Sequence, residues 1–213
     1  MNCRYREQYS KPKKIIENQS LGKLRYIRGT YIYNLVQSVK NNDKPWGLNY
    51  PKEINPLLHG GAIHCIDLLR WLGGCVKTVF AKSANFELQN YFNADTFLIT
   101  LEFVNGALGE LVVSNCAFRP NDFSIELWLS NGSITGTNIY KRKNDELINE
   151  PEVFKIEQNK IDLLLQLDDF IYAIENNCQT LNNFDEALEN FNLINAIESS
   201  LKDNEAKKVN FIN

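Results

Sequence analysis

Apolar residues recur at three- and four-residue intervals in three parts of the chain, which is the pattern of an amphipathic helix. In residues 57–72 this spacing places on one side Leu58, Ala62, Cys65, Ile66, Leu69 and Leu72. Two later stripes lie in residues 161–177 and 184–201, and consist of Leu163, Leu167, Phe170, Ile171 and Ile174, and of Ala187, Leu188, Phe191, Ile194, Ile197 and Leu201. We predict three helices, and we expect both C-terminal stripes to pack against a sheet.

Several segments between residues 75 and 140 are rich in β-branched and aromatic residues, as strands are. They read CVKTVFAKSA, ADTFLITLEF, ALGELVVSNCAF, FSIELWLS and SITGTNIY. Asn105-Gly106 and Asn131-Gly132 each separate two neighbouring segments, and such pairs favour tight hairpin turns because they tolerate positive φ. The pattern predicts an antiparallel meander and not a series of βαβ units.

The first part of the chain predicts a short helix, a strand and a loop. Residues 11–22 form the helix, with Pro12 near its first turn and Gly22 at its end. Residues 23–37 follow as a strand with apolar positions on both faces. Residues 38–56 are a long polar loop, in which Trp46 either covers a pocket or holds the loop to the surface. At the other end of the chain, KKVNF predicts an edge strand.

Composition and charge narrow the class of protein. The chain is 44% hydrophobic and 23% charged, which suits one globular domain over residues 1–213. It has no run of eighteen apolar residues and no apolar leader, so we expect a cytoplasmic protein without a membrane anchor. The net charge is −3, although residues 1–40 hold nine Lys and Arg against two Asp and Glu. Without a base-stacking motif, this skew predicts a solvated face or a subunit contact and no nucleic-acid binding.

Motifs for metal ions and nucleotides do not occur in the chain. The five cysteines are scattered and include no CxxC pair, so we expect reduced thiols instead of a zinc site. No GxGxxG or GxxxxGK[ST] motif follows a strand, so the chain shows no phosphate cradle of its own. We therefore predict no metal ligands and no cofactor-binding residues in this chain.

The candidate chemistry lies in the stretch NPLLHGGAIHCIDLLRWLGGC, which holds both histidines of the chain. A helical wheel gives this stretch a second face, made of Gly60, His64, Asp67 and Trp71. That face carries an imidazole, a carboxylate one turn later, and a glycine where a ligand could approach the backbone. His59 points elsewhere, and a spacing of five residues disfavours a two-histidine metal site. From the helix alone, His64 is equally a buried, hydrogen-bonded residue or a catalytic one.

A longer series of motifs extends over nearly the whole chain. In order, the chain contains NCRYREQYSKPKKIIENQSLGKLRYIRGTYIY, Trp46, GGAIHCIDLLRWLGG, ADTFLITLEFVNGALGELVVSN and LDDFIYAIENN…FDEALENFNLINAIESSL. This series resembles the C-terminal, substrate-binding domain of the glucose-fructose oxidoreductase/inositol dehydrogenase (Gfo/Idh/MocA) family. The resemblance implies an α+β fold: an open, predominantly antiparallel sheet with helices packed on one face, and no Rossmann domain in this chain. It also implies a homo-oligomer formed through the other face of the sheet.

The same resemblance implies a function. Enzymes of this family move a hydride between NAD(P) and a carbon of a sugar, inositol or related polyol. The histidine that matches His64 serves near the reacting hydroxyl as a proton donor or acceptor, and imidazole suits this role because it titrates near working pH. The residues that the resemblance implies for substrate binding are Trp46, His59, Asp67, and the basic-aromatic pair Arg4 and Tyr5.

Two departures from the family pattern shape this expectation. The family has an aspartate four residues before the histidine; that position is Gly60 here, unless a one-residue insertion brings His59 to it. The family's dinucleotide-binding domain and its catalytic lysine, normally N-terminal, are outside these 213 residues. We therefore expect a single substrate-binding and oligomerisation domain that binds no cofactor alone and needs NAD or NADP on a Rossmann domain. The alternative is a non-catalytic binding or dimerisation module that keeps only the fold.

Overall fold

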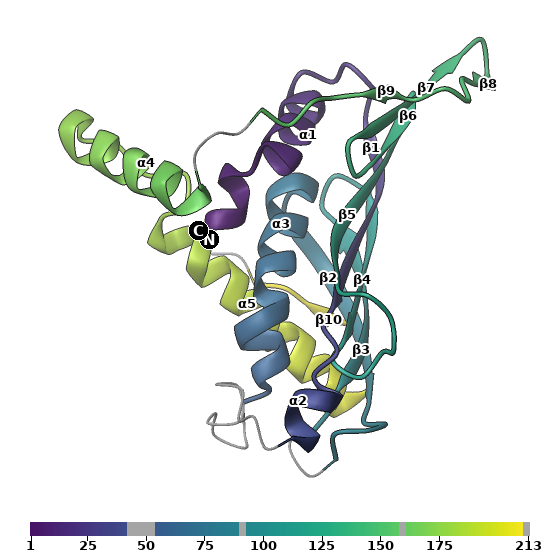
Figure 1. Ribbon diagram of the computed structural model, residues 1–213, viewed down its shortest axis with the longest axis vertical. Helices are drawn as coiled ribbons and strands as arrows, with labels where there is room; N and C mark the ends of the chain where they lie inside the picture. Colours follow the sequence, from purple (N-terminus) through teal and green to yellow (C-terminus); the bar gives the residue numbers. More distant parts are fainter. Residues whose placement is uncertain (42–53, 90–92, 158–160, 211–213) are drawn as a thin grey trace.

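A sheet covered on one face by helices makes up the fold (Figure 1). The computed structural model describes residues 1–41, 54–89, 93–157 and 161–210. Its strands are β1 (Leu24–Ile32), β2 (Val76–Ala84), β3 (Thr96–Phe103), β4 (Leu108–Ser114), β5 (Asp122–Leu129), β6 (Gly132–Thr135), β7 (Asn138–Lys143), β8 (Glu146–Leu147), β9 (Glu152–Val153) and β10 (Lys207–Lys208). Its helices are η1 (Asn2–Tyr5), α1 (Glu7–Glu17), α2 (Val36–Lys40), η3 (Leu57–Ala62), α3 (Ile63–Gly73), α4 (Asp162–Asn176) and α5 (Phe184–Asp203). The predicted α+β architecture is confirmed.

The order of the strands shows how the chain builds this sheet. Neighbouring strands follow the order β10-β2-β3-β4-β1-β5-β6-β7-β8, and β9 pairs with β7. The predicted meander therefore consists of two antiparallel parts, β2 to β4 and β5 to β7, and β1 lies between them. β1 runs antiparallel to β5 but parallel to β4, so the sheet is predominantly and not entirely antiparallel. β10 pairs with β2, which confirms the predicted edge strand.

The two predicted hairpin turns have different outcomes. Gly106 has a φ of +85° between β3 and β4, as expected of the Asn105-Gly106 turn. Between β5 and β6, however, Gly132 belongs to the strand and pairs with Leu129, so the turn residues are the two before it. A glycine is needed at 132 for another reason, because a Cβ there would lie 2.2 Å from the carbonyl oxygen of Tyr140. The predicted turn at Asn131-Gly132 is thus displaced by one residue.

Other element boundaries also differ from the sequence prediction. The segment SITGTNIY contains two strands, β6 and β7, because Gly136 has a φ of +59° and turns the chain between them. The first α-helix begins at Glu7, so Pro12 lies in its interior and not near its first turn. This helix ends at Glu17, well before Gly22, whose φ of +74° belongs to the turn that leads into β1.

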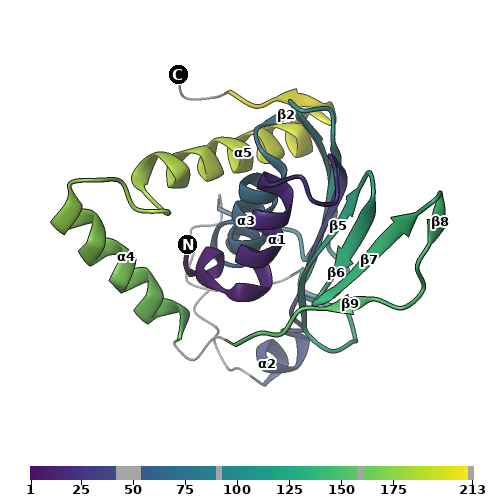
Figure 2. The ribbon, with the colours of Figure 1, turned by 90° about the horizontal axis from the view of Figure 1, so that it is seen from above.

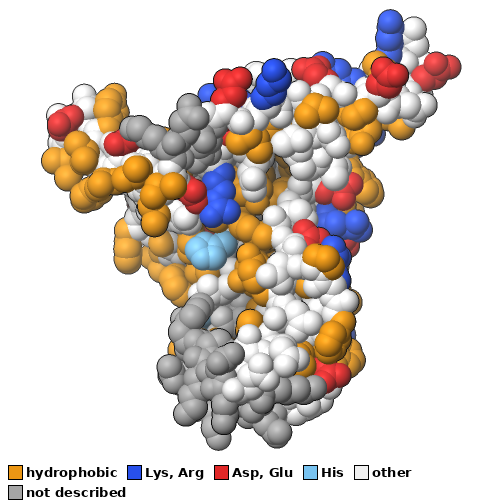
Figure 3. Space-filling view, viewed as in Figure 1, with side chains coloured by type: hydrophobic (Ala, Val, Ile, Leu, Met, Phe, Trp, Pro, Cys, Tyr) orange, Lys and Arg blue, Asp and Glu red, His pale blue; other side chains and the backbone are white. Residues whose placement is uncertain are grey.

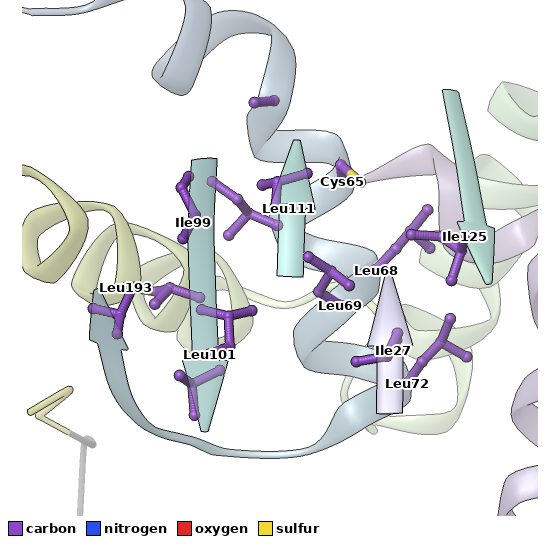
Figure 4. Packing of buried hydrophobic residues seen from close by; sticks show 14 of the residues in the cluster. Ile27, Cys65, Leu68, Leu69, Leu72, Ile99, Leu101, Leu111, Ile125 and Leu193 are labelled. Carbon is purple, nitrogen blue, oxygen red and sulfur yellow. The ribbon is translucent and has the colours of Figure 1, made fainter. Parts of the chain in front are cut away.

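The hydrophobic core lies between the sheet and helices α3 and α5. The stripe predicted for residues 57–72 is buried: no member is more than 3% exposed. Figure 4 shows Leu68, Leu69 and Leu72 of α3 directed at side chains of the strands. Gly29 of β1 lets α3 approach closely, since a Cβ at this position would lie 2.7 Å from the sulfur of Cys65.

The C-terminal stripes do not both pack against the sheet. In α5, Ile194 and Ile197 are fully buried, whereas Phe191 toward its N-terminus is 44% exposed. Figures 1 and 2 show α4 standing apart from the sheet. Every residue of its predicted stripe is exposed, from 45% to 65%: Leu163, Leu167, Phe170, Ile171 and Ile174. The prediction that this stripe covers the sheet is therefore wrong.

Candidate functional site

The helix that carries the candidate site begins with a π-helical segment. Its first residues, Leu57–Ala62, form a π-helix, and the α-helix proper starts at Ile63. Gly61 lies against Tyr31 of β1, so that a Cβ there would come within 2.6 Å of the tyrosine hydroxyl oxygen. Single π-turns inside helices occur frequently at functional sites. The predicted helix is thus confirmed, with an irregular first part that periodicity did not predict.

His64 lies at the start of α3, just after this irregular turn, and its side chain is half-buried. Nδ1 is buried and has no hydrogen-bond partner in the part of the chain that the structure describes. Burial lowers the pKa of His64, and the positive charges of the N-terminal amine and Arg6 lower it further, against the opposing charge of Asp67. The imidazole is therefore neutral at pH 7 and can accept a proton.

Asp67 is held by Arg4 and is fully buried. Nη2 and Nε of Arg4 donate to the two carboxylate oxygens of Asp67 at 2.7 and 2.9 Å, a bidentate pair. The amide of Asn190 donates to the same carboxylate at 2.7 Å. Arg4 is 1% exposed and Asp67 is 0% exposed. The substrate contacts that the resemblance implies for these two residues do not fit this geometry, because each side chain is enclosed by the other and by α5.

The network around Asp67 continues into side chains that the sequence did not single out. Glu186 accepts a hydrogen bond from Arg4 at 2.8 Å, and Arg70 donates to the side-chain oxygen of Asn190 at 2.7 Å. Burial would raise the pKa of Glu186, but the hydrogen bond and charge of Arg4 outweigh it and lower that pKa. Residues 186 and 190 lie more than 100 positions after Asp67, so no local spacing could have indicated this network.

Tyr5 connects the N-terminal segment to α4. Its hydroxyl donates to Asp169 at 2.7 Å, and the same carboxylate oxygen accepts the backbone N–H of Leu181 at 2.9 Å. Burial, followed by this hydrogen bond, raises the pKa of Tyr5 above its ordinary value. Tyr5 also lines a hollow of about 290 Å³ together with Leu163, Gln166, Leu167, Phe170, Thr180 and Asn182.

The remaining predicted residues lie away from His64 or outside the described residues. Nε2 of His59 contacts the carboxylate of Glu198 on α5 at 2.8 Å, and its ring lies 6.2 Å from that of Phe191. The two histidines therefore have different surroundings. Trp46 lies in the stretch that the structure does not describe. Figure 3 shows a histidine surface between the sheet and the lobe formed by α4 and α5, with charged side chains beside it.

Two other kinds of feature are absent from the described residues. Within 1–41, 54–89, 93–157 and 161–210, no three His, Cys, Asp or Glu side chains are arranged to hold a metal ion. No helix of these ranges is long and apolar enough to span a bilayer.

Known sequences match the chain in part. A family model described as GFO/IDH/MocA C-terminal domain matches residues 9–135, which is more than half of the chain. The chain is 28% identical to the uncharacterized oxidoreductase YrbE of Bacillus subtilis (strain 168) over 141 residues. It is also 28% identical to the myo-inositol 2-dehydrogenase of Thermotoga maritima over 142 residues. These matches cover 64% and 65% of this chain but only 39% and 40% of the relatives.

Solved structures match nearly the full length of the chain. Levoglucosan dehydrogenase in complex with NADH superposes with a TM-score of 0.84 at 21% identity, covering 99% of this chain and 65% of that one. The NAD binding oxidoreductase from Klebsiella pneumoniae gives a TM-score of 0.82 at 17% identity, with the same two coverages. At these identities the likeness establishes the fold alone.

Proposed function

Because this chain belongs to the GFO/IDH/MocA family, we propose that it is the substrate-binding domain of an NAD(P)-dependent oxidoreductase. We propose as its substrate a sugar, inositol or related polyol. The names of two similar proteins support this class: one is a myo-inositol 2-dehydrogenase, and the other is a levoglucosan dehydrogenase solved with NADH and L-sorbose. The chain also spans only part of each of these proteins, so the activity would belong to a larger assembly.

The observation that carries the proposal is that His64 is half-buried and has a lowered pKa. Oxidation of a secondary alcohol requires that the hydroxyl proton leave as the hydride leaves the carbon. A half-buried imidazole whose pKa is lowered by burial is neutral at pH 7, so it can accept that proton. In the reverse direction the protonated ring returns the proton to the carbonyl oxygen. His64 is thus assigned as the acid–base residue, and the buried Arg4–Asp67 pair behind it as a rigid support.

We propose that the nicotinamide cofactor is held by another domain and not by this chain alone. A dinucleotide is usually held at a glycine-rich turn between a strand and a helix, and residues 1–41, 54–89, 93–157 and 161–210 contain no such turn. The helix that bears His64 begins with buried Leu57 and Leu58, not with a phosphate-binding turn. When bound by another domain, the cofactor would supply the hydride chemistry. This chain would orient the polyol and hold or release the proton at His64.

We also propose that the open face of the sheet is the oligomer contact. Large apolar side chains are exposed on it: Leu98 and Leu108 at 57% each, and Trp128 at 46%. A shallow hollow of about 390 Å³ lies on the same face, lined in part by Tyr26 and Phe80. We place the assembly in the cytoplasm, as the sequence predicts. Sedimentation of the chain with and without Leu98→Glu tests the contact, because the substitution should lower the mass.

The second candidate, a non-catalytic module, has one observation in its favour. The carboxylate one turn after His64 already accepts three hydrogen bonds from Arg4 and Asn190, which disfavours a part in proton relay. Gly60 also stands where the family has an aspartate. A module of this kind would keep the fold and bind no polyol at the His64 end of α3.

The two candidates are separated by titrating the chain with polyols while the imidazole signals of His64 are followed by NMR. With myo-inositol, levoglucosan and L-sorbose as probes, we expect saturable shifts of His64 for at least one compound, and none for His59. In an assembly that includes a dinucleotide-binding domain, His64→Ala should lower turnover by about 10²–10⁴-fold, and His59→Ala should have little effect. No shift at His64 with any polyol, or full turnover in His64→Ala, would contradict the proposal.

A further inference from the structure

Arg6 carries a guanidinium that is only partly engaged by the rest of the chain. Its Nε donates to Asp162 at 2.7 Å, whereas neither Nη nitrogen has a hydrogen-bond partner in the residues that the structure describes. The side chain is 34% exposed. Arg4, two residues earlier, is different, because it is buried and binds Asp67 with both Nε and Nη2. The terminal edge of the Arg6 guanidinium is therefore open to a ligand.

The backbone of the N-terminal segment brings Arg6 close to His64. η1 ends at Tyr5, and Arg6 has an extended backbone, with a φ of −74° and a ψ of 130°, before α1 begins. Both η1 and α1 pack against α3, and Arg4 in η1 binds Asp67, one turn after His64. Arg6 is near enough for its positive charge to lower the pKa of the imidazole. Figure 3 shows basic and acidic side chains next to a surface histidine. The open guanidinium and the proposed acid–base residue thus border the same region.

We infer that Arg6 binds a carboxylate group of the substrate, so that the polyol of the proposed function is a sugar acid. This inference rests on the proposed function, which places the reacting hydroxyl at His64. A guanidinium matches a carboxylate because two parallel N–H groups can donate to its two oxygens. The two Nη nitrogens of Arg6 form such an edge, since Asp162 occupies only Nε. A carboxylate bound there would hold one end of the substrate while a hydroxyl reaches His64.

Charge selects a singly charged group for this position. A ligand that covers Arg6 removes water from the two Nη nitrogens, and this loss is unfavourable unless the ligand replaces the hydrogen bonds. A carboxylate replaces them with charge-assisted bonds, which are stronger than those of a neutral hydroxyl. A phosphate dianion fits less well, because Asp162 already lies against Arg6 and repels a double negative charge more than a single one. The chemistry therefore favours a hexonate or hexuronate over a neutral sugar or a sugar phosphate.

The test compares D-gluconate with D-glucitol, which carries a hydroxymethyl group in place of the carboxylate. Binding to the chain at pH 7.5 is measured by calorimetry and by the NMR signals of the His64 imidazole. Gluconate should bind about tenfold more tightly than glucitol, and both should shift His64. Arg6→Met should remove the preference. The control Arg142→Met changes an arginine on β7 that also pairs with an aspartate and is 47% exposed, and it should leave the preference intact.

A second variant, Asp162→Asn, separates carboxylate recognition from the attachment of α4. It breaks the same ion pair as Arg6→Met does, but it keeps the guanidinium and removes a negative charge beside it. Gluconate should therefore bind to Asp162→Asn at least as tightly as to the unchanged chain. If Arg6 served only to hold α4, both variants would weaken gluconate binding to the same extent, and that result overturns the inference.

The remaining outcomes separate this inference from the proposed function. Equal binding of gluconate and glucitol, or a preference that persists in Arg6→Met, overturns the inference. Inorganic phosphate that displaces gluconate at equal concentration would indicate a general anion site and also overturn it. In both cases a saturable shift of His64 with glucitol leaves the proposed function standing. Conversely, Arg6-dependent binding of gluconate without any shift of His64 supports the carboxylate site and contradicts the role proposed for His64.

Discussion

Helices α3 and α4 have the same pattern of apolar residues, but α3 buries its stripe and α4 exposes it. Both α3 and α4 carry an apolar stripe at helical spacing. In α3 this stripe lies in the core, where Leu69 is 0% exposed, whereas in α4 the equivalent stripe is open and Leu167 is 50% exposed. Periodicity therefore identifies a face that needs a partner, but it does not identify the partner.

Polar contacts explain why α4 is oriented this way. Two side chains of the N-terminal segment bind one side of α4. The guanidinium of Arg6 pairs with Asp162, and the hydroxyl of Tyr5 donates to Asp169. That side also contains Ala173, which is 7% exposed. The apolar stripe lies to the other side of these contacts and remains open. In α3, by contrast, Asp67 binds Arg4 while the apolar stripe of the same helix packs into the hydrophobic core.

The largest effect is expected from breaking the ion pair that holds α3. Arg4→Met leaves Asp67 buried without a charge partner, and the free energy of unfolding should fall by about 3–5 kcal/mol. Arg6→Met is the matched control in the α4 contact, where the half-exposed pair with Asp162 should contribute at most about 1 kcal/mol. Urea unfolding measures both. Equal losses in the two variants would mean that the two helices are attached in the same way.

Truncation in the core should have the next largest effect. Leu69→Ala removes a side chain in contact with the strands and leaves a cavity, so we expect a loss of about 2–5 kcal/mol in the free energy of unfolding. The measurement is urea unfolding at constant slope, since a changed slope would indicate a change in the unfolded state. A loss below about 1 kcal/mol would show that α3 does not bury its stripe as described.

Lowering the pH should reduce the free energy of unfolding, because His64 at the start of α3 has a lowered pKa. The folded pKa of His64 is lowered, so above pH 6.5 both folded and unfolded forms hold a neutral ring. As the pH falls below about 6.5, the unfolded chain takes up the proton first, and the free energy of unfolding falls until the folded pKa is passed. Each unit of separation contributes about 1.4 kcal/mol.

Unfolding at pH 7.5 and 5.0 tests this expectation. Between these two pH values, His64→Gln should lose less free energy of unfolding than the unchanged chain does. Protonation of carboxylates affects both proteins equally, so it does not contribute to the difference. NMR titration of Arg6→Met should show a higher pKa for His64, because a nearby positive charge has been removed. An unchanged pKa in that variant would show that the charge of Arg6 does not influence His64.

The smallest effect is expected on α4. Leu167→Ala makes the same chemical change as Leu69→Ala but at a half-exposed position, so the free energy of unfolding of the chain alone should change by no more than about 0.5 kcal/mol. Urea unfolding of the two leucine variants side by side gives the comparison directly. A loss in Leu167→Ala similar to that in Leu69→Ala would mean that the apolar stripe of α4 is already covered within this chain.

Part of the candidate site was predictable from the sequence, and part was not. Position 64 and the helix around it follow from local spacing, and the family resemblance assigned the histidine a role. The state of its neighbour Asp67 depends on Arg4 and Asn190, which lie 63 and 123 positions away along the chain. A helical wheel places Asp67 beside His64 but cannot show that another side chain has already neutralised it.

The sequence by itself determined the elements with strong periodicity: the helix that begins at residue 57, most strands of the sheet and the apolar stripes of α4 and α5. Only the tertiary structure decided that β1 lies between β4 and β5, that Asp67 is closed off by Arg4, and that α4 faces outward. The physical reason is the range of the interactions. Backbone geometry and side-chain periodicity act over a few residues, whereas strand order, buried ion pairs and the burial of a stripe depend on contacts between distant parts of the chain.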